Sequence, residues 1–309
     1  MGKERDPYYH INPLWDVPTT WRTEYCWERV KLSPVLRDVL RKALNSGQLC
    51  GVNQGTIRAL SKRHLCDDQA RLTKQGRIFG LSFCSLPKQC ELLGLQLHDL
   101  QIDYKGRPEL AAMRYLRELG LRTCHSEGGI IILILYSLCF DRLYRLGIKH
   151  WDGPIGARSW MYTSFICYGE LLDQHPELHQ KMMEDISSTD EDTMLRAFDT
   201  LKSWQEHPDY WMFRDWVGVD HAMARDTFRT LGRERLKKIA GLFFTDPYAF
   251  QKGWPDLACI DGESLRLIEV KTNDRLRISQ LITISEMMAT AQLSVEVLRL
   301  RRPQEKREK

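Results

Sequence analysis

Two carboxylates and one ammonium group are spaced so that they can meet at a single site. Asp256 precedes, and Glu269 and Lys271 follow, an Asp261-Gly262 pair that is typical of a β-hairpin turn. Side chains alternate between the two faces of a strand, so Glu269 and Lys271 point the same way on the return strand. Asp256 enters from the neighbouring strand. We therefore expect the three groups to converge.

This set of groups suits the hydrolysis of a phosphodiester bond. Carboxylate oxygens are ligands that Mg²⁺ or Mn²⁺ prefers, and such an ion activates water and polarises a phosphoryl oxygen. A lysine can orient the attacking water or stabilise the negative charge that develops. The alternative is a surface hairpin with an exposed Glu269–Lys271 pair. Pro255 before Asp256 and Gln280 after the hairpin favour the catalytic interpretation.

The string GWPDLACIDGESLRLIEVKTNDRLRISQ resembles the VRR-NUC domain of the PD-(D/E)xK nuclease superfamily. In that domain a G-x-P-D-L motif, a hairpin and an E-V-K motif precede a D-R-L-x-x-x-Q run that opens a helix. The resemblance covers residues 252–302 directly. The matching residues are Gly253, Pro255, Asp256, Leu257, Glu269, Val270, Lys271, Asp274, Arg275, Leu276 and Gln280.

A second segment, residues 114–146, is similar to a helix pair of the Fanconi-associated nuclease family. There a glutamate in an E-G step opens a long apolar helix, and here the step is Glu127-Gly128. The alternative is an acid that merely favours a helix N-terminus electrostatically. The same family has a helical insertion between the E-G step and the G-x-P-D motif, and this chain has a long, helically patterned segment there.

The resemblance implies an α/β fold with a restriction-endonuclease-like core, in which helices flank a mixed central sheet. It also implies a mostly helical N-terminal part and a helical insertion. We expect an N-terminal arm over 1–29, a helical module over 30–107, a nuclease region over 108–302 with an insertion at about 147–230, and a basic tail over 303–309.

The implied activity is that of an endo- or exodeoxyribonuclease that depends on Mg²⁺ or Mn²⁺ and cleaves branched or flapped DNA, with a role in DNA repair. Lys271 would orient or deprotonate the attacking water, and Gln280 would support it from the next helix. The implied metal ligands are Glu127, Asp256, Glu269 and the backbone carbonyl of Val270.

Basic residues in two regions are candidate DNA contacts. The first group flanks the active strand: Lys252, Arg275 and Arg277. The second lies in the helical module: Arg58, Lys62, Arg63, Lys74 and Arg77. The module resembles a winged helix if the apolar run from Arg77 to Phe83 is a strand. The alternative in both regions is an ordinary charged surface.

Bulk composition limits the other functions. The formal charge of +4 arises from 45 basic and 41 acidic residues among 309, which does not by itself indicate a nucleic-acid partner. Nine cysteines without a C-x-x-C pair argue against zinc, and with no signal peptide they favour an intracellular protein, in a nucleoid or a nucleus. The apolar run from Ile130 to Phe140 is too short to span a bilayer and predicts a buried helix.

Two other functions remain open. One is a Holliday-junction-type resolvase, although the long insertion argues against the simple symmetric dimer of compact resolvases. The other is a DNA-binding scaffold that keeps the fold and no longer cleaves. The expected polar positions are all filled, which argues against this scaffold.

Overall fold

The computed structural model describes residues 31–150, 177–205, 216–245, 250 and 253–302. Within these residues lies a mixed sheet with the strand order β1-β5-β4-β3-β2. The pairs β1–β5 and β5–β4 are parallel, whereas β4–β3 and β3–β2 are antiparallel. The strands are β1 (Gln96–Gln101), β2 (Arg122–His125), β3 (Leu257–Asp261), β4 (Ser264–Lys271) and β5 (Ser294–Arg301).

The predicted hairpin forms between β3 and β4. Its register pairs Leu257 with Ile268 and Asp261 with Ser264, and Gly262 occupies the turn with a φ of 58°. The expected alternation along β4 is also confirmed. Leu267 joins the larger hydrophobic core on one face of the sheet, whereas Ile268 joins a smaller core on the other. Glu269 and Lys271 therefore follow Leu267 onto the face of the larger core.

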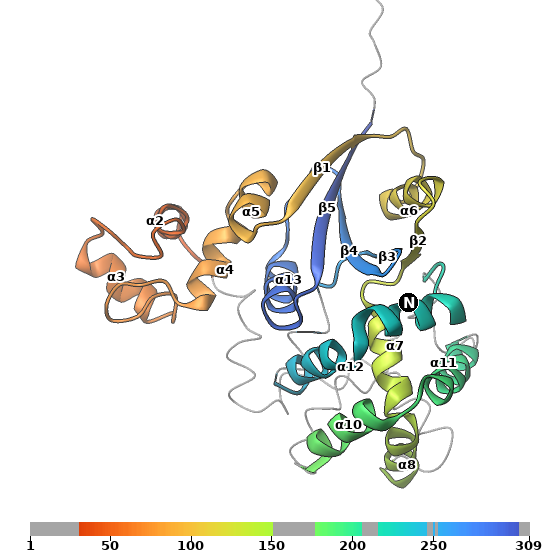
Figure 1. The fold of residues 1–309 in the computed structure, drawn as a ribbon. Coiled ribbons are helices and arrows are strands. Elements are labelled where there is room, and N and C mark those ends of the chain that lie inside the picture. Colours follow the sequence, from red (N-terminus) through yellow and green to blue (C-terminus); the bar gives the residue numbers. More distant parts are fainter. Residues whose placement is uncertain (1–30, 151–176, 206–215, 246–249, 251–252, 303–309) are drawn as a thin grey trace, which may run out of the picture.

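Helices cover both faces of this sheet (Figure 1). The smaller core lies under α6 (Pro108–Glu118), which contributes Ala112 and Leu116. The larger core lies under α7 (Gly129–Leu138), α12 (His221–Thr245) and α13 (Ile278–Ala291). This arrangement confirms the α/β class and the restriction-endonuclease-like core.

Helix α7 is the apolar run that was expected to be buried. Ile130, Ile131 and Ile134 have no exposed surface. The helix packs against α11 and α12, and its side chains are part of the larger core. None of the helices in the described ranges combines the length and the apolar character that crossing a membrane requires.

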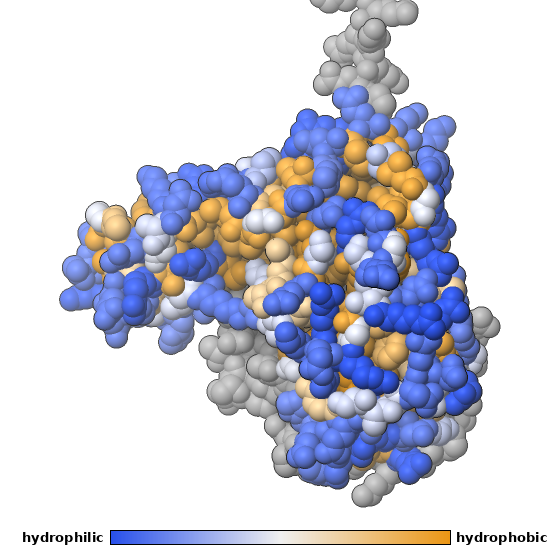
Figure 2. Space-filling view, in the orientation of Figure 1, coloured by the Kyte–Doolittle hydropathy of each residue, from blue (hydrophilic) through white to orange (hydrophobic). Residues whose placement is uncertain are grey.

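The N-terminal helices are α2 (Pro34–Ala43), α3 (Gln54–Ser61), α4 (Lys74–Ser82) and α5 (Leu86–Leu93). The strand expected after Arg77 is wrong, because this run is helix α4. Thr73 caps that helix by accepting a hydrogen bond from the Gly76 amide at 3.0 Å. On the face in Figure 2, apolar residues gather where these helices meet the sheet. β1, within the range expected as a helical module, pairs with β5 in the sheet.

The region between α7 and β3 is largely helical in its described parts. Its helices are α8 (Phe140–His150), α10 (Glu177–Ser188), α11 (Glu191–Gln205) and α12. Asp190 caps α11 by accepting a hydrogen bond from the Thr193 amide at 2.8 Å. Gly232 interrupts α12 with a φ of 66°. Helices α8 and α10 lie at the end of α7 that is away from the sheet, whereas α12 also contacts β2, β4 and α13 (Figure 1).

Candidate active site

A cavity of about 580 Å³ opens where β3 begins and β4 ends. It brings together residues from α6, the turn before α7, the segment just before β3, the end of β4 and the start of α13. All five predicted catalytic residues line it: Glu127, Asp256, Glu269, Lys271 and Gln280. Val270, whose carbonyl was expected to bind metal, lines it too.

Glu269 and Lys271 form a buried ion pair in this cavity. The Lys271 Nζ atom lies 2.7 Å from Glu269 Oε1, and the two residues are 5% or less exposed. This burial excludes the alternative of a surface hairpin with an exposed pair. Asp256 lies beside them because its Oδ2 accepts a hydrogen bond from the Val270 amide at 2.7 Å.

Gln280 joins this pair from the first turn of α13. Its Oε1 accepts from Lys271 Nζ at 3.1 Å and from the Arg277 amide at 3.0 Å, while its Nε2 donates to Glu269. Gln280 therefore holds the acid and the base of the ion pair in one orientation. The helix can approach this closely because Gly253 is a glycine: a Cβ there would lie 2.2 Å from the Ser279 carbonyl oxygen.

Glu127 reaches the cavity through a tight turn. Its φ of 47° lies in the left-handed region, and Gly128 follows with a φ of 81°. The amides of Ser126 and Glu127 both donate to the carbonyl oxygen of Asp256, at 3.2 and 3.3 Å. A non-glycine residue in this conformation is uncommon and is held by its surroundings. Here those surroundings are the strand that carries Asp256.

Two carboxyl groups of the cavity, those of Asp256 and Glu269, have raised pKa values. Burial raises the pKa of Asp256 to about 6, and the charges of Glu109 and Glu127 add to the rise. Burial, followed by the charge of Asp256, raises the pKa of Glu269 to about 8. Burial alone would lower the pKa of Lys271, but the carboxylates around it raise it above its usual value. The cavity therefore concentrates negative charge that a cation would neutralise.

The donor set fits a divalent cation chemically. Glu269 Oε2 is buried and has no hydrogen-bond partner among the residues that the structure describes, so it is an acceptor that a cation would satisfy. Oxygen atoms of this kind are the ligands of Mg²⁺ and Mn²⁺. However, the described residues contain no group of three or more His, Cys, Asp or Glu side chains arranged to hold a metal ion. Lys271 and Gln280 instead occupy Glu269 Oε1.

Apart from Lys74 and Arg77, which lie on α4, the candidate DNA-binding residues separate into three groups. Arg277 lines the acidic cavity, and Arg275 and Arg277 line a neighbouring cavity of about 700 Å³ together with Arg299 and Arg301. A second group, exposed on or just after α3, lines neither cavity: Arg58, Lys62 and Arg63. Lys252 lies outside the described residues.

Two residues that the sequence did not single out belong to this region. Glu109, in the first turn of α6, lines the acidic cavity, and its charge raises the pKa of Asp256. Gln89 of α5 is fully buried and bonds to both the amide and the carbonyl of Leu276, at 2.8 and 3.1 Å. For Glu109, the sequence offers only a proline followed by an acid, which is common at the start of a helix. No sequence pattern marks Gln89 as part of this region.

No protein-family model matches the sequence, and no curated protein matches it. Solved structures do match its fold. A crystal structure of paFAN1 bound to 5′-flap DNA with a 2-nucleotide flap and a gap has a TM-score of 0.52 and 14% identity, over 98% of this chain and 57% of that chain. A second paFAN1 structure, with a 1-nucleotide 5′ flap and a gap, has a TM-score of 0.50 and 16% identity, over 92% and 52%.

This chain therefore spans little more than half the length of these two neighbours. At such identities the likeness concerns the fold. It extends beyond the hairpin and the E-G step to nearly the whole chain. The fold resembles the nuclease region of the Fanconi-associated nuclease family, as the two sequence segments predicted.

Proposed function

We propose that the chain is a metal-dependent nuclease that hydrolyses phosphodiester bonds in flapped or branched DNA. The observation that carries this proposal is the gathering of Glu127, Asp256, Glu269, Lys271 and Gln280 at one cavity, from segments far apart in the sequence. Glu269 and Lys271 are buried at this cavity, and burying charged groups raises their free energy, so a merely structural pair of this kind is disfavoured.

Two observations support DNA as the substrate: the fold, and the position of the arginine-lined cavity of about 700 Å³ (the basic cavity) next to the carboxylate-lined cavity of about 580 Å³ (the acidic cavity). The structural neighbours were crystallised with 5′-flap DNA. Arg277 lines both cavities, so a backbone phosphate held by Arg275 and Arg277 would lie next to the acidic residues. We infer that residues 108–302 supply the catalytic region, and that the helices over 30–93 flank the path of the DNA.

Glu127, Asp256, Glu269 and the Val270 carbonyl would hold Mg²⁺ or Mn²⁺. When bound, such an ion supplies an activated water and offsets charge on the phosphate. Lys271 would orient the water and stabilise charge that develops on a non-bridging phosphate oxygen. Gln280 would keep the ammonium group of Lys271 in place. Asp256 would in addition fix the end of β4 through the Val270 amide.

The test is a cleavage profile of the full chain on labelled 5′-flap, 3′-flap, four-way-junction and linear duplex DNA, each with Mg²⁺, Mn²⁺ or a chelator. We expect cleavage of flaps with metal and none with chelator. Lys271→Ala should lower the rate by about 100-fold or more while binding stays nearly unchanged. Cleavage in chelator would refute the metal dependence. Binding without cleavage in every metal would identify a scaffold, and paired symmetric nicks in the junction a resolvase.

A further inference from the structure

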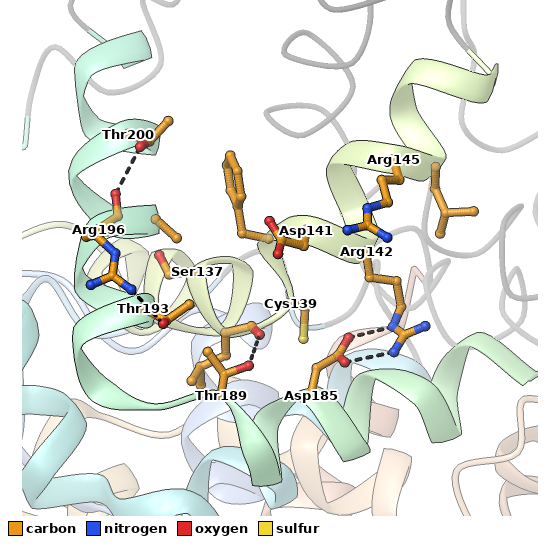
Figure 3. Close-up of a pocket in the computed structure, with 14 residues that line it drawn as sticks. Ser137, Cys139, Asp141, Arg142, Arg145, Asp185, Thr189, Thr193, Arg196 and Thr200 are labelled. Atoms are coloured by element: carbon orange, nitrogen blue, oxygen red, sulfur yellow. Dashed lines mark hydrogen bonds and ion pairs between the residues drawn. The ribbon is translucent and has the colours of Figure 1, made fainter.

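A third large cavity lies in the helical region beyond the sheet, between the α7–α8 junction and helices α10 and α11. Its volume of about 620 Å³ is in the range of small-molecule sites, which is about 300–1,000 Å³. Figure 3 shows Asp141 and Arg145 of α8 on one side of it and Thr193 and Arg196 on the other. Nothing in the proposed catalytic mechanism uses these residues.

Two arginines at this cavity keep free hydrogen-bonding capacity. Arg142 is engaged, because it forms a bidentate pair with Asp185 at 2.5 and 2.8 Å. Arg145 is exposed and has no hydrogen-bond or ion-pair partner among the residues that the structure describes. Arg196 is exposed and donates to Thr193, one turn earlier on its own helix, at 2.8 Å. Asp141 is the one opposing charge besides Asp185 among the residues that line the cavity.

The hydroxyl groups of the lining determine which ligand fits. Each donates its proton within the protein, to a backbone carbonyl or to Asp190: Ser137, Thr189, Thr193 and Thr200. Such hydroxyls still offer lone pairs as acceptors. The cavity therefore presents acceptors from its hydroxyls and donors from its arginines. A bare phosphate needs mainly donors, whereas a nucleotide brings phosphate acceptors together with the N–H donors of a base.

One wall of the cavity is apolar and could pack against a nucleotide base. Leu138, Phe140 and Leu146 line the cavity, and Phe140 is only half-buried. The Phe140 ring packs against two other rings, since its centroid lies 5.6 Å from the ring centroids of both Tyr144 and Trp204. Rigid aromatic surface beside arginines is the combination by which proteins hold single-stranded nucleic acid.

We propose that this cavity binds an unpaired nucleotide of single-stranded DNA, with the base against the Phe140 wall and the phosphates at Arg145 and Arg196. The choice of DNA as ligand rests on the proposed function. Helix α7 links the two sites, since Glu127 precedes it and the cavity lies at its other end. Its 10 residues span about 15 Å. At the duplex spacing of about 3.4 Å per nucleotide along one strand, that distance corresponds to about four nucleotides, and an extended unpaired arm of a branched substrate would cover it with fewer.

The test measures binding of the full chain to a labelled oligothymidylate of about 12 nucleotides, a length suited to a single-strand site, in excess chelator. An abasic strand of equal length is the second probe. We expect the wild-type chain to prefer the strand with bases. The Arg145→Ala/Arg196→Ala variant should reduce the slope of log affinity against log salt by about 1.4, at about 0.7 per phosphate contact.

Two further variants separate binding from folding defects. Asp141→Asn should strengthen binding, because it removes the opposing charge, and a folding defect would not produce a gain. Arg114→Ala, which removes an exposed arginine from α6 on the other side of the sheet, should change nothing. An unchanged salt slope in the double variant, or equal affinity for the abasic strand, would overturn the proposal.

The chelator separates this inference from the proposed function. A chain that binds through Arg145 and Arg196 and cleaves no DNA in any metal would refute the nuclease alone. A chain that cleaves flaps while the double variant binds like the wild type would refute the second site alone.

Discussion

The backbone amide of Glu127 donates to the carbonyl oxygen of Asp256 at 3.3 Å. This bond fastens the turn that carries one acid to the start of the strand that carries another. It also explains how Glu127 can keep a φ of 47°, which costs a non-glycine residue about 1 kcal/mol or more. The position of this acid therefore depends on the turn around it.

Gly128→Ala should disrupt this turn. A Cβ at Gly128 would lie 2.3 Å from the Trp254 ring, and its φ of 81° is unfavourable for alanine. We expect the free energy of unfolding to fall by about 3 kcal/mol and cleavage to be lost. The matched control is Gly120→Ala, where φ is 83° but no atom lies within 4 Å. It isolates the conformational cost of about 1 kcal/mol. Equal losses in a urea titration would show that Trp254 does not constrain the turn.

The raised pKa of Glu269 predicts how stability depends on pH without metal. The folded-state pKa of about 8 lies above the ordinary value of 4.5, so the folded state binds the extra proton between these values. Its stability should therefore decrease as pH rises from about 5 to about 8. Glu269→Gln removes this dependence, because the amide does not titrate.

Thermal unfolding in chelator at several pH values measures this effect. The melting temperature of Glu269→Gln relative to wild type should rise by several degrees between pH 5 and pH 8. Added Mn²⁺ should stabilise the wild type at pH 8 and leave the variant nearly unchanged, because the cation binds the ionised carboxylate. A constant difference across pH would mean that Glu269 is already ionised at pH 5.

The sequence predicted the parts of the site that are local. Glu269 and Lys271 are two residues apart on a strand, so alternation alone placed them on one face. The contact between the Glu127 turn and Asp256 came from the family resemblance, since no periodicity links such distant segments. The expectation that three acids surround one cation stays a prediction: the described residues contain no ready-made group of three such ligands, and Lys271 pairs with Glu269.

Other features depend on packing that the sequence does not reveal. Glu109 enters the cavity only because α6 covers the smaller core with its N-terminus next to Asp256. Gln89 meets Leu276 across 187 residues, and nothing in a local pattern marks that contact. The run from Arg77 to Phe83 was assigned to a strand because a short apolar run is ambiguous. The Thr73 cap makes it a helix.

Gln89→Leu should loosen the segment that leads from β4 to α13. Gln89 satisfies the amide and the carbonyl of Leu276, and both would be left buried without partners. We expect a loss of about 2 kcal/mol in unfolding free energy and a lower cleavage rate with nearly unchanged DNA affinity. Glu91→Ala, which breaks an exposed pair with Lys88 on the same helix, should cost less than about 0.5 kcal/mol. A variant with an unchanged rate would show that α5 does not position the site.

Arg275 and Arg277, which line the cavity of about 700 Å³, should contribute separately to DNA affinity. Arg299 and Arg301 are both paired with Asp99, which leaves Arg275 and Arg277 as the arginines of this cavity that can meet phosphate. Arg275→Ala/Arg277→Ala should lower the slope of log affinity against log salt on duplex-containing flaps by about 1.8, at about 0.9 per contact. Arg58→Ala on α3 is the comparison. A decrease of about 0.9 there would place the N-terminal helices on the DNA, and an unchanged slope would restrict the phosphate contacts to the cavity beside the acids.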